Sequence, residues 1–168
     1  KSNYNSVEDR KKVSMKKDKF RGIGISSYIE ACGGGGPESA SVTVSKNGSI
    51  EVKIGTQSNG QGHATSYAQI VSEILDIDIE QIEIIQGNSK EIATGSGTGG
   101  SRSMPVGGSA LYKATKDFLN KSKNIIASNQ SLDTNDLSYE KGFFKYQQKS
   151  FSLSDVANIA NDENENLE

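Results

Sequence analysis

Apolar and polar residues alternate in two short runs in the first third of the chain. The apolar positions of these runs are Val42, Val44, Ile50, Val52 and Ile54. Alternation with a period of two is typical of strands that bury one face. Between the runs stands Asn47-Gly48, a dipeptide that favours a tight turn between antiparallel strands. The pattern therefore predicts a β-hairpin over residues 39–55.

The next segments change from helical spacing to strand spacing and back. Helical spacing predicts a helix over residues 62–76 and a second helix over residues 106–127. The apolar positions of the two helices are Tyr67, Ile70, Val71, Ile74 and Leu75, then Leu111, Ala114, Thr115, Phe118 and Ile125. Between the helices, Ile82, Ile84 and Ile85 indicate a buried strand.

The two ends of the chain have weaker patterns. Residues 4–19 read as a polar helix with only Tyr4, Val7 and Met15 as apolar contacts. Residues 22–31 are a strand candidate, and the glycine-rich run at residues 33–37 ends it, because glycine adopts backbone angles that other residues avoid. Near the other end we expect a strand or hairpin at residues 143–146 and a helix whose first turn is capped by the Ser154 hydroxyl.

This order of elements predicts an α/β fold, a two-layer sandwich of the α+β type. Its mixed sheet follows the order strand, strand, helix, strand, helix, with the helices on one face. We expect an N-terminal polar helix at residues 1–21, a binding half-domain at 22–127, a C-terminal strand and helix at 128–166, and a tag remnant at 167–168. Because the chain begins without methionine, we expect a segment of a longer protein.

The amino-acid composition narrows the class of protein to which the chain can belong. The 168 residues, 33% hydrophobic, fit one domain with a thin core, or part of a larger one. No apolar run approaches the roughly 20 residues of a membrane span, and the start lacks the apolar centre of a signal peptide. We therefore expect a cytoplasmic protein without a membrane partner. The lysines near the start lack interleaved aromatic residues, which favours a solvated helix face over a nucleic-acid site.

Cysteine and histidine limit the metal chemistry. With one cysteine, Cys32, and one histidine, His63, the chain has no internal disulfide and cannot supply a four-ligand zinc site. Cys32 follows the strand candidate and is expected to be a small buried residue. Any metal here would come with a cofactor or with a second chain.

A glycine-rich segment, "GTQSNGQGH", leads directly into the first predicted helix. The first amides of a helix lack internal partners and attract anions, and Gly60 and Gly62 would let a ligand approach them. Gln61 offers a donor and an acceptor to a heterocycle or a phosphate, although it also fits a turn in which it points to water. His63 suits either a ligand contact or a helix cap. No serine, cysteine or carboxylate lies near enough in sequence to form a catalytic triad.

A second glycine-rich stretch precedes the longer helix. "GSGTGG" matches the dinucleotide pattern of glycines, but the preceding strand ends several residues too early, and no Gly-Lys-Ser/Thr motif follows. "TGGSRS" reads as a backbone nest lined by the hydroxyls of Thr98, Ser101 and Ser103, with Arg102 able to bind a phosphate at two points. A flexible surface loop remains the alternative. Both helix starts belong to one sheet, so they could face one ligand.

Together "GTQSNGQGH" and "GTGGSRS" resemble the molybdenum-cofactor-binding region of the xanthine dehydrogenase and aldehyde oxidase family, most nearly in the large subunits of carbon monoxide dehydrogenases. "RGIGISSYIEACGGG" and the Asn47-Gly48 hairpin extend the resemblance over residues 4–125. The resemblance implies a molybdopterin dinucleotide with molybdenum, in the cytosine form. It places Gly60, Gln61, Gly62 and His63 at the pterin and phosphates, and Gly100, Ser101, Arg102 and Ser103 beside the metal and dinucleotide, with Thr65 as a further contact.

The resemblance also implies partners and a reaction. Relatives insert oxygen from water into carbon monoxide, an aldehyde or a heterocycle, and pass electrons to iron–sulfur clusters (2Fe-2S) and FAD on partner subunits. The family's catalytic glutamate and substrate loop have no counterpart here, so the isolated segment is expected to be inactive and to need the remainder of the large subunit. Ala64 stands where many relatives have glutamate. A non-catalytic module that binds a phosphorylated ligand is the second hypothesis, and a Rossmann-like dehydrogenase the third.

Overall fold

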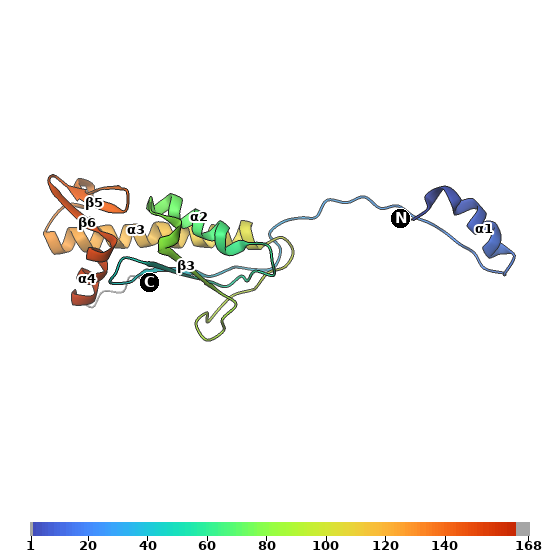
Figure 1. The fold of residues 1–168 in the computed structure, drawn as a ribbon, viewed down its shortest axis with the longest axis horizontal. Helices are drawn as coiled ribbons and strands as arrows, with labels where there is room; N and C mark the ends of the chain where they lie inside the picture. Colours follow the sequence, from blue (N-terminus) through green and yellow to red (C-terminus); the bar gives the residue numbers. More distant parts are fainter. Residues whose placement is uncertain (1, 164–168) are drawn as a thin grey trace. The chain divides into compact units, whose positions relative to one another are not determined.

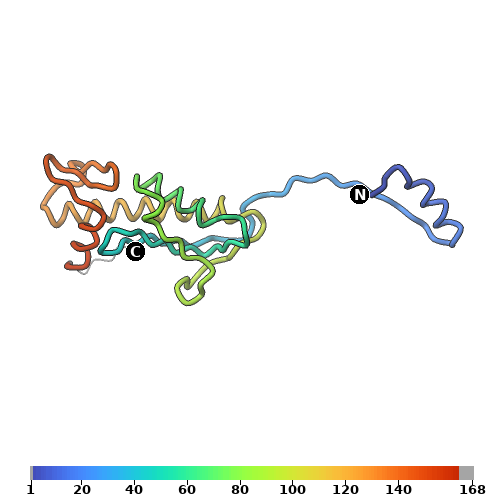
Figure 2. Tube along the Cα trace, in the orientation of Figure 1, coloured from blue at the N-terminus to red at the C-terminus, as the bar shows by residue number. Residues whose placement is uncertain are grey.

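The computed structural model describes residues 2–163. The chain forms two compact units, Lys1–Glu30 and Ala31–Glu168, and Figures 1 and 2 trace the elements of each. Within the described part of the chain, no helix combines the length and apolarity needed to cross a bilayer. The residues predicted as a tag remnant, and the end of the predicted C-terminal segment, lie outside the described range.

The first unit contains a 3-10 turn, η1 (Tyr4–Ser6), and a short helix, α1 (Val7–Met15). The helix therefore ends earlier than residue 19. Of its predicted apolar contacts, Val7 is buried, whereas Tyr4 and Met15 are exposed. The strand predicted from residue 22 is wrong, because that segment is extended without a ladder partner and Ile25 and Ile29 are 81% and 98% exposed. Cys32, expected to be buried, is also exposed.

The larger unit is built on a three-stranded mixed sheet in the order β1-β2-β3. β1 (Ala40–Val44) and β2 (Ile50–Ile54) form the predicted antiparallel hairpin, with Val42 opposite Val52. Gly48 adopts a φ of 88° in the turn, a left-handed angle that suits glycine. β3 (Ile82–Gln86) runs parallel to β2. It was predicted to be buried, but it lies at an edge of the sheet and is half-buried.

Two helices cover the sheet. α2 (His63–Leu75) packs on β3, and α3 (Ser109–Gln130) packs on β1 and on α2. Figure 1 shows both helices on the same side of the strands. A single π-helical turn, η3 (Ser103–Gly108), leads into α3. The shared core contains Ile50, Val52, Ile54, Tyr67, Val71, Leu75, Leu111 and Phe118.

A second, antiparallel sheet follows α3. It consists of β4 (Ser138–Glu140), β5 (Phe143–Tyr146) and β6 (Lys149–Ser152), with 3-10 turns η2 (Ile79–Gln81) and η4 (Thr134–Asp136) elsewhere in the connections. α4 (Leu153–Glu163) then packs on α3. The α/β fold class is confirmed, while the sheet at the C-terminal end is richer than the single hairpin expected.

The capping residue of α4 differs from the prediction. Ser152 Oγ accepts a hydrogen bond from the Asp155 amide (3.1 Å), and Asp155 Oδ2 accepts one from the Ser152 amide (2.8 Å). This reciprocal pair is a capping box with aspartate in place of glutamate. Ser154, the predicted cap, instead donates its hydroxyl to the carbonyl of Lys46 (2.5 Å) and so ties α4 to the β1–β2 turn.

Candidate functional site

The first glycine loop, residues 55–62, ends at a helix start that no side chain caps. Gly62 is the N-cap residue of α2 and has left-handed angles (φ 75°, ψ 26°), followed directly by the helical His63. A left-handed residue followed by a right-handed one turns successive amides to one side, which forms an anion-binding nest. A Cβ added at Gly60 or Gly62 would meet nothing within 4 Å. The amides at this end of α2 are therefore open to a ligand.

The predicted side chains of the first loop divide into exposed and buried ones. Gln61 is exposed, and its Oε1 accepts a hydrogen bond from the Asn59 amide (2.5 Å). Thr65 is exposed on the first turn of α2. His63 is only 8% exposed, and its Nδ1 finds no partner among the described residues. The ring does not cap the helix.

The second glycine loop, residues 94–103, also ends at the start of a helical element. Gly97, Gly100 and Ser101 have positive φ angles of 72°, 53° and 51°. The left-handed Ser101 precedes Arg102, which is right-handed (φ −97°, ψ −22°), so this loop repeats the nest-like order of the first. Added Cβ atoms at Gly99 and Gly100 would meet nothing within 4 Å.

Hydrogen bonds, those of Tyr67 buried and those of Thr98 exposed, hold the two glycine loops side by side. The hydroxyl of Tyr67, on α2, donates to the Ser103 carbonyl (2.9 Å) and lies 2.7 Å from Thr56 Oγ1. Thr98 Oγ1 accepts from the Gln57 amide (3.2 Å) and donates to the Gln57 carbonyl. Burial raises the pKa of Tyr67, which keeps the phenol protonated as a donor. The two helix starts are therefore fixed next to each other.

Replacing Tyr67 with phenylalanine should weaken this link. The ring would still fill the core, but the Ser103 carbonyl and the Thr56 hydroxyl would each lose a buried partner. We expect the free energy of unfolding to fall by about 1–3 kcal/mol. Hydrogen exchange of the amides of residues 94–103 measures this loss, and Tyr139→Phe, which removes a hydroxyl that donates to the Leu75 carbonyl (2.7 Å) at the far end of α2, is the matched control that should leave these amides unchanged. Equal exchange in wild type and Tyr67→Phe would contradict the linking role.

The structure corrects the interpretation of Arg102 as a phosphate-binding side chain. Arg102 is 3% exposed, and its guanidinium points into the protein. A guanidinium carries five N–H groups. Here they donate to the carbonyls of Gly34, Gly36, Pro37 and Gly97 and to the carboxylate of Glu38. No guanidinium N–H remains for an anion in this conformation, and the backbone amide of Arg102 donates to the Gly99 carbonyl (3.2 Å).

The hydroxyls of the second glycine loop are also partly used inside the protein. Ser103 is buried, and its Oγ lies 2.8 Å from Thr98 Oγ1. Ser101 is exposed.

The sequence patterns did not indicate Glu38, Thr56 or Tyr67 as residues that support the site. For Glu38 the available signal was Arg102, because an arginine buried beside a glycine-rich segment needs a nearby carboxylate. Among residues 2–163, no three His, Cys, Asp or Glu side chains gather closely enough to hold a metal ion.

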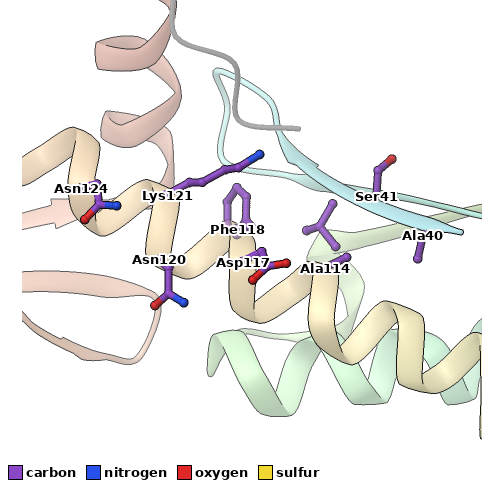
Figure 3. A pocket seen from close by; sticks show the side chains of 9 residues that line it. Ala40, Ser41, Ala114, Asp117, Phe118, Asn120, Lys121 and Asn124 are labelled. Atoms are coloured by element: carbon purple, nitrogen blue, oxygen red, sulfur yellow. The ribbon is translucent and has the colours of Figure 1, made fainter.

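A separate groove lies between β1 and α3. It has a volume of about 390 Å³ and is lined by residues that include Ala40, Val42, Asp117 and Phe118. Figure 3 shows Phe118 directed from α3 toward β1, with Asp117 at the side of the groove. None of the predicted site residues lines this groove. It is therefore distinct from the two glycine loops.

Comparison with known proteins identifies two groups of relatives, the first found by sequence. The carbon monoxide dehydrogenase large chain of Hydrogenophaga pseudoflava is 34% identical over 139 residues, which cover 83% of this chain and 17% of that protein. The nicotine 6-hydroxylase large subunit of Paenarthrobacter nicotinovorans is 28% identical over 169 residues, covering 94% of this chain and 21% of that protein. The chain thus spans about a fifth of the length of these relatives.

Solved structures agree with the sequence relatives. A crystal structure of the Cu,Mo-CO dehydrogenase in its carbon monoxide reduced state matches with a TM-score of 0.69 and 30% identity, over 94% of this chain and 22% of that one. The reconstituted CO dehydrogenase from Oligotropha carboxidovorans matches with a TM-score of 0.66 and 33% identity, over 74% of this chain and 16% of that one. The family model for the molybdopterin cofactor-binding domain matches residues 1–168, and the chain therefore belongs to that family.

Proposed function

We propose that the two glycine loops bind the molybdopterin dinucleotide, with Gly60, Gln61, Gly62, His63 and Thr65 on one side and Gly100, Ser101, Arg102 and Ser103 on the other. The observation that carries this proposal is that two nest-like helix starts are locked next to each other by the Tyr67 and Thr98 hydrogen bonds. Ser103 would contribute through its backbone, since its side chain bonds within the protein. Arg102, whose amide donates to the Gly99 carbonyl (3.2 Å), would keep the loop in shape through its buried side chain.

The residues present fit such a ligand. Phosphates suit unpaired amides at a helix start, and the left-handed glycines leave room for close approach. Gln61 can present its amide nitrogen to a phosphate or to the edge of a heterocycle. The buried, unpartnered Nδ1 of His63 is a further polar atom at the start of α2 that a bound group can satisfy. The cytosine form of the dinucleotide remains a proposal from the family resemblance.

At the level of the whole protein, we propose that this domain belongs to the large subunit of a cytoplasmic molybdenum hydroxylase. When bound, the molybdenum cofactor would supply the redox chemistry for oxidising carbon monoxide, an aldehyde or a heterocycle. The oxygen inserted into the substrate would come from water. Subunits carrying FAD and 2Fe-2S clusters would accept the electrons. This domain would bind and orient the cofactor, and it would be inactive alone because two adjacent loops form one wall of a site that needs to be enclosed on several sides.

Replacing Gly100 with asparagine in the complete large chain tests the binding proposal. Asparagine tolerates left-handed angles, so the loop should keep its φ of 53° while a side chain enters the open space. We expect roughly tenfold weaker cofactor retention, which corresponds to about 1.4 kcal/mol. Molybdenum analysis and pterin fluorescence of the purified chain measure it.

Gly48→Asn is the matched control, because it places the same residue at a left-handed glycine in the β1–β2 turn. It should retain wild-type molybdenum. Unchanged molybdenum and pterin in both Gly100→Asn and Gln61→Ala would overturn the proposal. If those two variants instead lost binding of a phosphorylated small molecule, the loops would belong to a non-catalytic binding module.

A further inference from the structure

A buried ion pair joins the second glycine loop to a turn that precedes the sheet. Glu38 and Arg102 are 64 positions apart, and their side chains are 0% and 4% exposed. Together with the four carbonyls that accept from Arg102, they connect residues 94–103 to the glycine–proline turn, residues 33–39. We refer to these two side chains as the Glu38–Arg102 clasp.

Glu38 bonds to both segments at once. Besides the guanidinium, its carboxylate accepts from the amide of its neighbour Ser39 (3.1 Å) and from the amide of Ser96 in the second glycine loop (3.2 Å to Oε2). Charged groups removed from water are stable only when paired and hydrogen-bonded, and removal of one partner leaves the other uncompensated. The two segments are therefore held together by groups that depend on each other.

Two further hydrogen bonds between the glycine–proline turn and the second glycine loop act directly on that loop. The Gly33 amide donates to the Ser101 carbonyl (3.3 Å), and the Ser96 hydroxyl donates to the Pro37 carbonyl (2.9 Å). Ser101 needs this support because a positive φ is uncommon for a residue with a side chain. The clasp thus fixes the conformation in which Gly100 and Ser101 present their backbone to the open side.

We propose that Glu38 is a positioning residue for the cofactor, acting through the Glu38–Arg102 clasp. The clasp holds the second glycine loop in its binding conformation before the dinucleotide arrives, which reduces the ordering that binding would otherwise require. The inference rests on the proposed function of Gly100 and Ser101. It assigns a role to a residue whose side chain, fully buried against Arg102, has no exposed surface to offer a ligand.

The test uses Glu38→Gln in the complete large chain, prepared with and without cofactor. Glutamine keeps the shape of the side chain but removes the charge that balances Arg102. In the cofactor-free chain, we expect amides of residues 94–103 to exchange hydrogen about tenfold faster, while those of β2 and α3 are unchanged. In the cofactor-loaded chain, molybdenum should dissociate about tenfold faster, because the loop no longer holds its binding conformation.

Arg102→Lys is the second variant, since lysine keeps the charge but offers three donors instead of five. It should show the same local exchange even if Glu38→Gln does not fold. Glu140→Gln, which breaks the exposed Lys145–Glu140 pair, is the matched control for loss of one negative charge. It should change neither the exchange of residues 94–103 nor the molybdenum content.

The outcomes separate this inference from the proposed function. If Glu38→Gln and Arg102→Lys both leave exchange at residues 94–103 at the wild-type rate, the clasp does not hold the loop and the inference is overturned. Faster exchange with unchanged molybdenum dissociation overturns the positioning role, while loss of molybdenum in Gly100→Asn would show that the binding site itself stands. Unchanged molybdenum in Gly100→Asn and in both clasp variants would remove the proposed function as well.

Discussion

Replacing Gly95 with alanine is expected to destabilise this domain by about 3 kcal/mol or more. A Cβ at Gly95 would lie 2.5 Å from Gly55 Cα and 2.7 Å from the Gly55 carbonyl oxygen. Both are backbone atoms of the residue that directly follows β2, and they cannot move aside without displacing the strand. The two glycine loops cross at this point with no room for a side chain, so alanine forces either the sheet or the second loop out of place.

Gly99→Ala is the matched control for this substitution. It changes the same residue type in the same loop, but a Cβ there meets nothing within 4 Å. Hydrogen exchange of β2 amides within the complete chain measures the free energy of opening for both variants. The expected loss is confined to Gly95→Ala. Similar protection of β2 in both variants would show that the crossing can relax, and the explanation from close approach would be wrong.

The Gly55–Gly95 crossing shows what sequence patterns predict well and what they do not. Local periodicity located β1, β2, α2 and α3, because each of these elements buries one side against the same core. The glycine-rich motifs also located both loops. Neither pattern indicated that two glycines 40 positions apart would be in contact, since that depends on how the helices pack. The same holds for Tyr67, which read as an ordinary core residue but links the two loops through its hydroxyl.

The predictions that the structure contradicts failed for specific physical reasons. Residues 22–30 have the apolar character of a strand, but a strand forms only where a neighbouring strand supplies its hydrogen bonds. Ser154 precedes a good helical pattern, yet Ser152 is better placed to cap it because Asp155 returns the hydrogen bond. Arg102 was assigned to a phosphate from its chemistry alone. Its burial beside Glu38 depends on the glycine–proline turn, which is far away in the sequence.

Truncating Phe118 to alanine is the second change expected to have a large effect. Phe118 is 2% exposed and extends from α3 toward β1, where it closes the inner side of the groove seen in Figure 3. Removing a buried phenyl ring costs about 3–5 kcal/mol, because contacts are lost and a cavity remains. Tyr112→Ala, on the same helix but 51% exposed, should cost less than about 0.5 kcal/mol.

The two α3 variants also test how the site depends on the core. Phe118 contributes to the layer between β1 and α3, and α3 continues directly from η3, which contains Ser103. If the helix loosens on the sheet, the hydrogen bond from Tyr67 to the Ser103 carbonyl should open with it. We therefore expect Phe118→Ala to increase hydrogen exchange at residues 94–103 as well as in α3, and Tyr112→Ala to leave both unchanged. Faster exchange in α3 alone would show that the glycine loops keep their positions independently of this packing.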